Sequence, residues 1–248
     1  DNERFLRFFW EIDRSRIGFD YTDSAEAVKS GTKWFPYNKG GSFRKWAGNG
    51  ELIVNWKHGG REIASAGMTS FRGKGFYFHE GITWGDISTS TFSCRYTPPG
   101  RIFDIKGTSS FPKEGDFPAV MSLLNSSVGT YILNFLNPTM TFQSGDIRRL
   151  PLAKDKVESA SRSSVPRLID LSAEDWDAYE TSWGFTALPL LSPDHRAETL
   201  AASYANLRTH WQAMTDEMQR LEEENNQIFI EAYGLKSELT PEVPIEEI

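Results

Sequence analysis

The sequence predicts an α+β protein: a mixed, largely antiparallel β-rich domain with packed helices, then a helical region with one long coiled-coil-like helix. Between residues 75 and 107, short apolar runs alternate with Gly, Pro, Ser and Thr, which is typical of strands joined by tight turns. Between residues 200 and 232, apolar residues recur at alternating spacings of four and three, which predicts a heptad seam. The net charge also changes, from +4 over residues 1–150 to −11 over residues 151–248.

The bulk composition limits the class of protein. A chain of 248 residues, 39% of them hydrophobic and 13% aromatic, can form one large domain or two modest ones. We expect a first domain over residues 1–152, a helical region over 153–238 and a disordered acidic tail over 239–248. The single cysteine, Cys94, excludes an internal disulfide framework and fits a reducing cytosol.

Two further features concern the ends and the environment of the chain. No run of about 18 apolar residues is present, so no membrane span or membrane partner is expected. The first 25 residues carry Arg and Asp throughout and do not read as a signal peptide. The sequence begins with Asp in the middle of a pattern, and we therefore interpret it as a piece of a longer protein.

Local patterns predict the elements of the first domain. Residues 1–17 fit a strand or a buried connector, and residues 20–31 fit a short polar helix. Residues 33–46 contain a proline and a Gly-Gly pair and are interpreted as a loop. Residues 51–57 predict a strand, and residues 58–74, rich in Gly, Ser and Arg, predict an irregular excursion.

The second half of this domain is expected to be mainly helical. Asp116 can cap a helix that has a proline in its first turn, and residues 128–136 predict a second helix. Asn137-Pro138 ends that helix, because proline disfavours the helical conformation of the residue before it. Residues 139–142 predict a short strand, and residues 143–151 lead out of the domain.

The C-terminal region is expected to hold a linker or short helix over 154–167, a helix from Ser172 and one long helix from Ser192 to Gly234. The predicted seam of the long helix is Leu200, Tyr204, Leu207, Trp211, Met214, Met218, Leu221, Asn225, Ile228 and Ala232. Asn225 would occupy a core position, where a buried asparagine fixes register. The seam would pack on a partner helix or the parent protein, or fold back on residues 173–183 as a hairpin.

A hydroxyl-rich loop is the first candidate binding feature. Small hydroxyl side chains followed by an arginine, on a rigid sheet, can read the hydrogen-bonding edges of DNA bases. The alternative is that such loops are solvated turns. The candidates for base readout are Trp84, Thr89, Ser90, Thr91 and Arg95.

Positive charge is the second candidate feature. Residues 29–113 carry a net charge of +8, and phosphate binding depends on local rather than total charge. Potentially exposed aromatics interleave with these cations, namely Trp34, Phe35, Tyr37, Phe43, Trp46 and Trp56. The candidates for phosphate contact are Lys39, Arg44, Lys45, Arg61, Arg72 and Lys74. The alternative is an ordinary soluble surface. Gly40-Gly41 is not a nucleotide phosphate loop, because no Gly-Lys-Ser/Thr follows it.

Catalytic and metal-binding patterns are weak. The histidines at positions 58, 79, 195 and 210 have no ligand spacing with one another or with Cys94, so no metal site is predicted. No Ser/His/Asp arrangement stands out. Asp86 with Asp104-Ile105-Lys106 fits the pattern of a metal-dependent nuclease superficially, and the alternative is a surface ion pair.

Several phrases resemble one protein family. They are Asp1 to Arg7, Lys33 to Gly41, Val54 to Trp56, Gly81 to Trp84, Asn137 to Thr139, Phe142 to Ile147, Asp175 to Asp177, Glu180 to Trp183, Tyr233 to Leu235 and Glu238 to Val243. Together they resemble the C-terminal part of the adenine-specific DNA methyltransferases of BREX phage-defence systems, the phage-growth-limitation X family. The resemblance runs along nearly the whole chain.

The resemblance implies a DNA target-recognition domain with a helical spacer. Base-reading residues would lie between Gly81 and Arg101, and Phe142 to Pro151 would close the domain. The family methylates adenine with S-adenosylmethionine, which would bind the absent N-terminal methyltransferase domain. Asn137-Pro138-Thr139-Met140 lacks the second proline and the aromatic residue of the family's catalytic motif. We therefore expect no catalysis and no cofactor in this fragment alone.

Two hypotheses follow. In the first, the chain recognises double-stranded DNA in the bacterial cytoplasm, through the base and phosphate candidates named above. In the second, it is a protein-interaction module whose acidic helical half docks other BREX proteins or a phage inhibitor. Steep salt dependence of DNA binding favours the first, and no binding at low salt favours the second.

Overall fold

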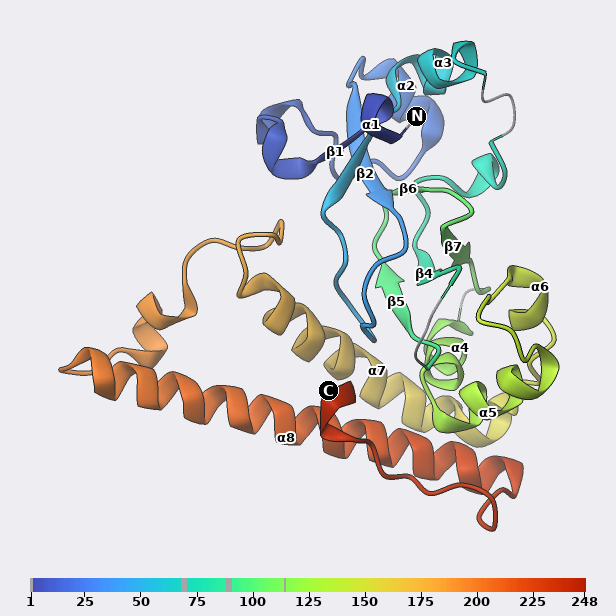
Figure 1. Ribbon diagram of the computed structural model, residues 1–248, viewed down its shortest axis with the longest axis vertical. Coiled ribbons are helices and arrows are strands. Elements are labelled where there is room, and N and C mark those ends of the chain that lie inside the picture. The colour runs from blue at the N-terminus through green and yellow to red at the C-terminus, as the bar shows by residue number, and fades with distance from the viewer. Residues whose placement is uncertain (1, 68–70, 88–90, 114) are drawn as a thin grey trace.

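A computed structural model describes residues 2–67, 71–87, 91–113 and 115–248 of the chain, with the side chain of Asn2 left out. It confirms the predicted α+β class. Two small sheets occupy one half of the molecule and two long helices, α7 and α8, cross the other half (Figure 1). Helices α4, α5 and α6 lie beside the second sheet and join the two halves (Figure 1).

The first sheet has the strand order β1-β3-β2-β6. Its strands are β1 Leu6–Phe8, β2 Trp34–Asn38, β3 Leu52–Asn55 and β6 Ile102–Phe103. Strand β3 pairs antiparallel with both β1 and β2, and Val54 lies opposite Leu6 and Phe35. Strand β6 pairs parallel with β2, with Tyr37 opposite Ile102.

The second sheet is antiparallel throughout, with the order β5-β4-β7. Its strands are β4 Gly81–Gly85, β5 Cys94–Thr97 and β7 Gly107–Ser110. Ile82 in the central strand lies opposite Tyr96 on one side and Ser110 on the other. Asn125 joins this sheet to the end of α4, because its side chain accepts from Cys94 N at 2.9 Å and donates to Cys94 O at 3.1 Å.

The described helices begin with α1 Asn2–Phe5, α2 Ser24–Lys29 and α3 Lys57–Ser65, and continue with α4 Phe117–Leu124, α5 Ser127–Leu136, α6 Ser144–Ile147, α7 Lys154–Asp177 and α8 Leu200–Tyr233. The expected helices over 20–31, after Asp116 and over 128–136 are confirmed as α2, α4 and α5. Within the described ranges, no single helix is long and apolar enough to cross a membrane, although α4 and α5, bent by 71°, pass that test of length and composition as a pair.

Three expectations for the first domain were wrong. Residues 34–38 form strand β2 rather than a loop, because all five are buried between β3 and β6. Pro36 is tolerated because the pairing with β6 begins only at Tyr37, so that edge needs no donor before it. Residues 57–65 form α3 rather than an irregular excursion, although φ is positive at 58–60. The expected strand over 139–142 is reduced to one bridge, between Ile87 and Thr141.

Helix α7 is continuous where a linker and a separate helix were expected. Its buried residues recur at helical spacing and include Val157, Val165, Leu168 and Leu171. Pro166 lies on the exposed side, where the backbone carbonyl that it leaves unpaired can be hydrated. Ser172, the expected N-cap, is instead a buried residue inside this helix. Burial of one face therefore outweighs the serine-rich composition.

Helix α8 starts later than expected and packs within its own chain. Thr199 caps its start, and Gly234, with φ of 70°, ends it as predicted. It packs against α7 and α5, so the helix folds back on its own chain as the hairpin alternative proposed, but its partner is α7, Lys154–Asp177, rather than residues 173–183 (Figure 1). Asn225 is buried as expected, but it donates to the Ser122 carbonyl at the end of the first domain rather than to a partner helix.

The last ten residues were expected to form a disordered tail. The structure instead places them along α8. Gln219 donates to Val243 O at 2.8 Å, and Asn226 donates to Pro241 O at 3.0 Å. Val243 is buried at 5% exposure. Polar side chains on α8 thus satisfy the backbone of the returning segment, which brings the C-terminus back to the middle of the helix (Figure 1).

Candidate nucleic-acid interface

The ends of the two sheets meet at one surface, which we call the loop face and define as residues 39–42, 85–87, 104–107 and 139–142. Gly40 lies so close to the second sheet that a Cβ there would be 3.2 Å from Lys106 O and 3.6 Å from Gly85 Cα. Asp86 O accepts a hydrogen bond from Phe142 N at 2.9 Å. Loops distant in sequence are therefore fixed against one another.

The loop face exposes apolar side chains. Ile87 is 56% exposed, Ile105 is 60% exposed and Met140 is 56% exposed. Three large exposed apolar residues on adjoining loops are unusual for a surface without a ligand or partner, whereas single ones are common. The loop face is therefore the strongest candidate for a contact surface in the β-rich half.

The acidic pattern that suggested a nuclease has a structural role on this face. Lys106 Nζ lies 2.8 Å from Asp86 Oδ2 in a partly exposed ion pair. Asp104 Oδ1 accepts from the backbone amides of Lys106 and Gly107, at 2.7 and 3.0 Å, and so closes the turn before β7. In the described part of the chain, no cluster of three or more His, Cys, Asp or Glu side chains is arranged to hold a metal.

The base-readout candidates have different positions. Trp84 is 1% exposed, and its indole N–H donates to Phe142 O at 2.8 Å. With its ring in the core and its only donor occupied, Trp84 is a packing residue, contrary to the expected base contact. Arg95 is also buried, at 2% exposure, in the middle of β5. Thr91 is half-buried, and Thr89 and Ser90 lie outside the described residues.

Four phosphate candidates remain accessible. Arg61, Arg72 and Lys74 are exposed, and Lys39, which belongs to the loop face, is half-buried. Lys74 Nζ lies 5.6 Å from the centre of the Trp56 ring, a cation–π contact that leaves the ammonium available. Lys39 follows β2 and Arg61 follows β3, so in an antiparallel pair they lie at opposite ends of the first sheet.

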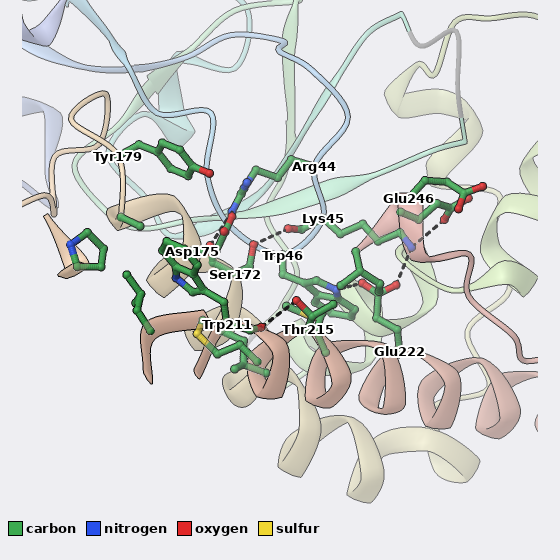
Figure 2. A pocket seen from close by; sticks show the side chains of 18 of the residues that line it. Arg44, Lys45, Trp46, Ser172, Asp175, Tyr179, Trp211, Thr215, Glu222 and Glu246 are labelled. Carbon is green, nitrogen blue, oxygen red and sulfur yellow. Dashed lines mark hydrogen bonds and ion pairs between the residues drawn. The ribbon is translucent and has the colours of Figure 1, made fainter. Parts of the chain in front are cut away.

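Arg44 does not point to solvent, contrary to the expectation of phosphate contact. Its Nη2 lies 2.7 Å from Asp175 Oδ2 and 2.8 Å from Ser172 O on α7, and its Nε donates to Ala47 O at 2.9 Å. The guanidinium also lies over the Trp176 ring, 5.1 Å from its centre. Arg44 therefore fixes the β2–β3 loop to α7 (Figure 2).

Lys45 is likewise buried, again contrary to expectation. Its Nζ lies 2.6 Å from Glu222 Oε2 and 3.1 Å from Glu247 Oε2, and the side chains of Lys45 and Glu222 are 9% and 3% exposed. The other oxygen of Glu222 accepts from Trp46 Nε1 at 2.6 Å. Figure 2 shows Lys45 reaching toward Glu222 while Arg44 reaches the other way, toward Asp175.

The charges in this cluster affect one another. Burial alone would lower the pKa of Lys45, but the carboxylates of Glu222 and Glu247 raise it. Burial raises the pKa of the Glu222 carboxyl, and the positive charge of Lys45 opposes that rise. An ion pair this deeply buried depends on both partners, since either one alone would be an uncompensated charge.

No protein-family model matches the chain. The chain is 38% identical to the adenine-specific methyltransferase PglX of Lacticaseibacillus casei (strain Zhang), in an alignment 254 residues long that covers 98% of the chain. Over 216 residues, 86% of the chain, it is 35% identical to the adenine-specific methyltransferase BrxX of Escherichia coli O9:H4 (strain HS). The chain is similar to one part of the adenine-specific methyltransferases. These identities confirm the resemblance expected from the sequence. The chain spans 21% of the length of the first relative and 17% of the length of the second.

The similarity to the methyltransferases covers both halves of the chain, because the match to PglX includes 98% of its residues. The β-rich half and the helical half are also physically continuous, through the contacts of Arg44 and Lys45 with α7 and α8. The stretch shared with PglX and BrxX is therefore one packed unit, and the helices set the position of the β2–β3 loop.

The sequence did not identify the residues that form this connection. Ser172 donates to Lys45 O at 2.9 Å and lies within 3.2 Å of Ala47 O, so it holds the loop backbone directly. Glu222 lies next to Leu221 of the predicted seam, and an acidic residue flanking a seam is the one signal that could have suggested a charged contact there. Nothing local to Arg44 or Lys45 distinguishes a buried cation from a surface cation.

A cavity of about 700 Å³ lies between the β2–β3 loop, α7 and α8. Aromatic side chains contribute to its wall, namely Phe43, Tyr179, Tyr204 and Trp211. Figure 2 shows Tyr179 and Trp211 among them. Tyr204 and Trp211 belong to the predicted seam of α8, but they are 50% and 38% exposed. The first half of the seam is thus left partly open at Tyr204 and Trp211, although Leu207 between them is buried, and in the second half Met218 and Leu221 are buried.

Proposed function

We propose that this chain is the sequence-specific double-stranded DNA recognition module of an adenine-specific, S-adenosylmethionine-dependent DNA methyltransferase in a bacterial phage-defence (BREX) system. The observation that carries the proposal is the match of 98% of the chain to 21% of the PglX sequence. In such an enzyme, a segment of this size next to the catalytic domain would carry target recognition.

The chemistry of methylation would belong to the rest of the protein. The chain has no Asn-Pro-Pro-aromatic motif and no glycine-rich cofactor-binding turn. Methylation of a base inside a duplex also requires the base to be flipped into a pocket. S-adenosylmethionine and the flipped adenine would therefore bind the methyltransferase domain, while this chain holds the flanking duplex.

Two groups of residues support contact with a duplex. The loop face offers fixed loops with exposed apolar side chains, which can contact thymine methyl groups and base edges. Lys39, Arg61, Arg72 and Lys74 offer charge to phosphates on either side. Lys39 and Arg61 follow opposite ends of the antiparallel β2–β3 pair, so these cations would contact phosphates at separate points along a duplex.

Neutralising the four accessible cations should weaken binding to all duplex sequences alike. In a variant carrying Lys39→Gln, Arg61→Gln, Arg72→Gln and Lys74→Gln, each lost phosphate contact should reduce the slope of log K against log salt by about 0.9. Fluorescence anisotropy with labelled duplexes at several salt concentrations measures both effects.

The matched control removes positive charge from the helical half. Arg208→Gln and Arg220→Gln change exposed arginines of α8, and both affinity and salt slope should stay at the wild-type values. If the four-site variant kept the wild-type slope, the assignment of these cations to phosphates would be wrong.

A second candidate function, protein docking, is favoured by the cavity of about 700 Å³. It lies between the β2–β3 loop and the helical half, which has a net charge of −11, and its wall carries exposed aromatic rings. Such a surface suits a basic, apolar segment of another defence protein or of a phage inhibitor. The salt titration separates the two functions, because a docking module would not bind duplex DNA even at low salt.

A further inference from the structure

Arg95 is the least expected side chain of the β-rich half. It is 2% exposed, and no hydrogen bond or ion pair among the described residues involves its guanidinium. Its Nη2 is fully buried and has no hydrogen-bond partner in the part of the chain that the structure describes. Burial lowers the pKa of Arg95 to about 10, so the group is still charged at neutral pH. Unpaired buried charge is costly, and in native proteins it requires an explanation such as a missing ion.

The surroundings of Arg95 add further positive charge. Arg101 is half-buried. The positive charges of Arg44 and Arg101 oppose the charge of Arg95, and the negative charge of Glu51 favours it. Glu51 is too far away for an ion pair, since no pair of these two residues occurs within 4.0 Å. The backbone on both sides of Arg95 is held in place, because Cys94 O accepts a hydrogen bond from Trp46 N and Tyr96 N donates one to Trp46 O.

A small cavity of about 20 Å³ lies against Arg95 and belongs to the loop face. Its wall includes Gly41 and Ser42 of the β2–β3 loop, Gly85 at the end of β4, Ile87 after it, and Ser93. None of the described residues that line it is an acid, and both serines carry hydroxyl groups that can donate. Its volume admits about one water-sized atom, so a phosphate oxygen could enter it but a base or a whole phosphate could not.

We propose that this cavity receives one non-bridging oxygen of a phosphate group, which Arg95 binds with Ser42 and Ser93 beside it. The ligand is a phosphodiester of the DNA backbone, because backbone oxygens project from the duplex whereas base edges lie inside the grooves. This inference rests on the proposed DNA recognition and gives Arg95 a phosphate in place of a base edge. The Gly40-Gly41 segment then serves a phosphate site without being a nucleotide-binding loop.

The first test uses inorganic phosphate and the 248-residue chain. Phosphate should raise Tm more than chloride does at equal ionic strength. Arg95→Met should reduce that difference to the part that phosphate contributes to any protein through its exclusion from the surface. The same variant should raise Tm in chloride, because it removes a charge that is unpaired in the free protein. A merely structural arginine would show the reverse: Arg95→Met would lower Tm in chloride, and the phosphate response of the wild type would equal that of the variant.

The second test uses duplex DNA. Arg95→Met should weaken binding about ten- to a hundredfold, as for the loss of a hydrogen bond to a charged group, and should lower the salt slope by about 0.9. Arg208→Gln, on the exposed side of α8, is the control and should change neither value. If Arg95→Met does not fold, Arg95→Lys replaces it and should retain the salt slope with reduced affinity, because lysine keeps the charge and loses the fork.

The outcomes distinguish this site from the proposed function. Phosphate-dependent stabilisation that needs Arg95, without duplex binding, would uphold an anion site and remove its DNA ligand, which overturns the proposal as stated. Duplex binding with an unchanged affinity and slope in the Arg95 variants would leave DNA recognition standing and overturn the site. The expected result is that Arg95→Met loses both the phosphate-specific rise in Tm and part of its affinity for the duplex.

Discussion

Glu222→Ala is expected to destabilise the protein by about 3–5 kcal/mol, the cost of breaking a buried ion pair by removing one partner. The substitution leaves the Lys45 ammonium and the Trp46 indole N–H buried without an acceptor, apart from the contact of Lys45 with Glu247. The β2–β3 loop then loses its attachment to α8. Urea denaturation, followed by far-ultraviolet circular dichroism, measures the free energy of unfolding.

Two control variants make the Glu222 result specific. Glu224→Ala, two residues along the same helix, removes an exposed pair with Arg220 and should change stability by less than about 0.5 kcal/mol. The double variant Lys45→Met with Glu222→Leu replaces both charges by apolar groups and should recover part of the loss, because only the Trp46 N–H, at a cost of about 1–3 kcal/mol, then stays buried without an acceptor. If Glu222→Ala cost no more than Glu224→Ala, the cluster would not hold the two halves together.

Trp84→Ala is expected to cost about 3–5 kcal/mol, the range for a large-to-small change of a buried aromatic residue. Trp84 is 1% exposed, packs near Phe92 at a ring distance of 6.0 Å and bonds Phe142 O. Trp84→Phe should keep most of the buried area and cost about 1–3 kcal/mol, largely through the unpaired carbonyl. Thermal and urea denaturation of both variants would check these values.

The functional part of the Trp84 prediction separates packing from base readout. Under conditions where Trp84→Phe is fully folded, its affinity and preference for duplex DNA should equal those of the wild type. Trp10→Ala, at a ring 48% exposed, is the matched control and should change stability far less. If folded Trp84→Phe lost its preference for particular DNA sequences, Trp84 would contribute to base recognition and the packing role would be insufficient.

Those elements that the sequence predicted correctly carry local signals. Gly234 ends α8 because a glycine tolerates φ of 70° there, and Asn137 ends α5 in extended conformation before a proline. Asp23 caps α2 by accepting from two backbone amides. Each of these effects involves residues within a few positions of one another, so a single sequence is sufficient to show them.

The failures all depend on long-range burial. Strand β2 was mistaken for a loop because its Pro36 and the Gly-Gly pair after it are turn signals, whereas burial on both sides makes it a strand. Helix α7 continues through Pro166 because Val165 and Leu168 are buried against other elements. Local propensity is a weak prior in such segments, and tertiary packing outweighs it.

The candidate site shows the same division. The sequence revealed the excess of positive charge, but Lys45 is neutralised by Glu222, 177 positions away, and Arg44 by Asp175, 131 positions away. Arg95 was expected to contact a base edge because it follows a hydroxyl-rich loop. Its burial, and the absence of a hydrogen-bond partner for its Nη2 among the described residues, were not expected. Such pairings across the fold leave no pattern in a single chain.

The most direct measurement of the central claim is a segment exchange with PglX of L. casei, which aligns with 98% of this chain. The matching fifth of that enzyme would be replaced by this chain, and methylated adenines would be mapped by sequencing DNA from cells that carry either version. The account predicts that the methylated sequence changes when this chain is introduced. Methylation by the chimera at the unchanged L. casei sequence would contradict it.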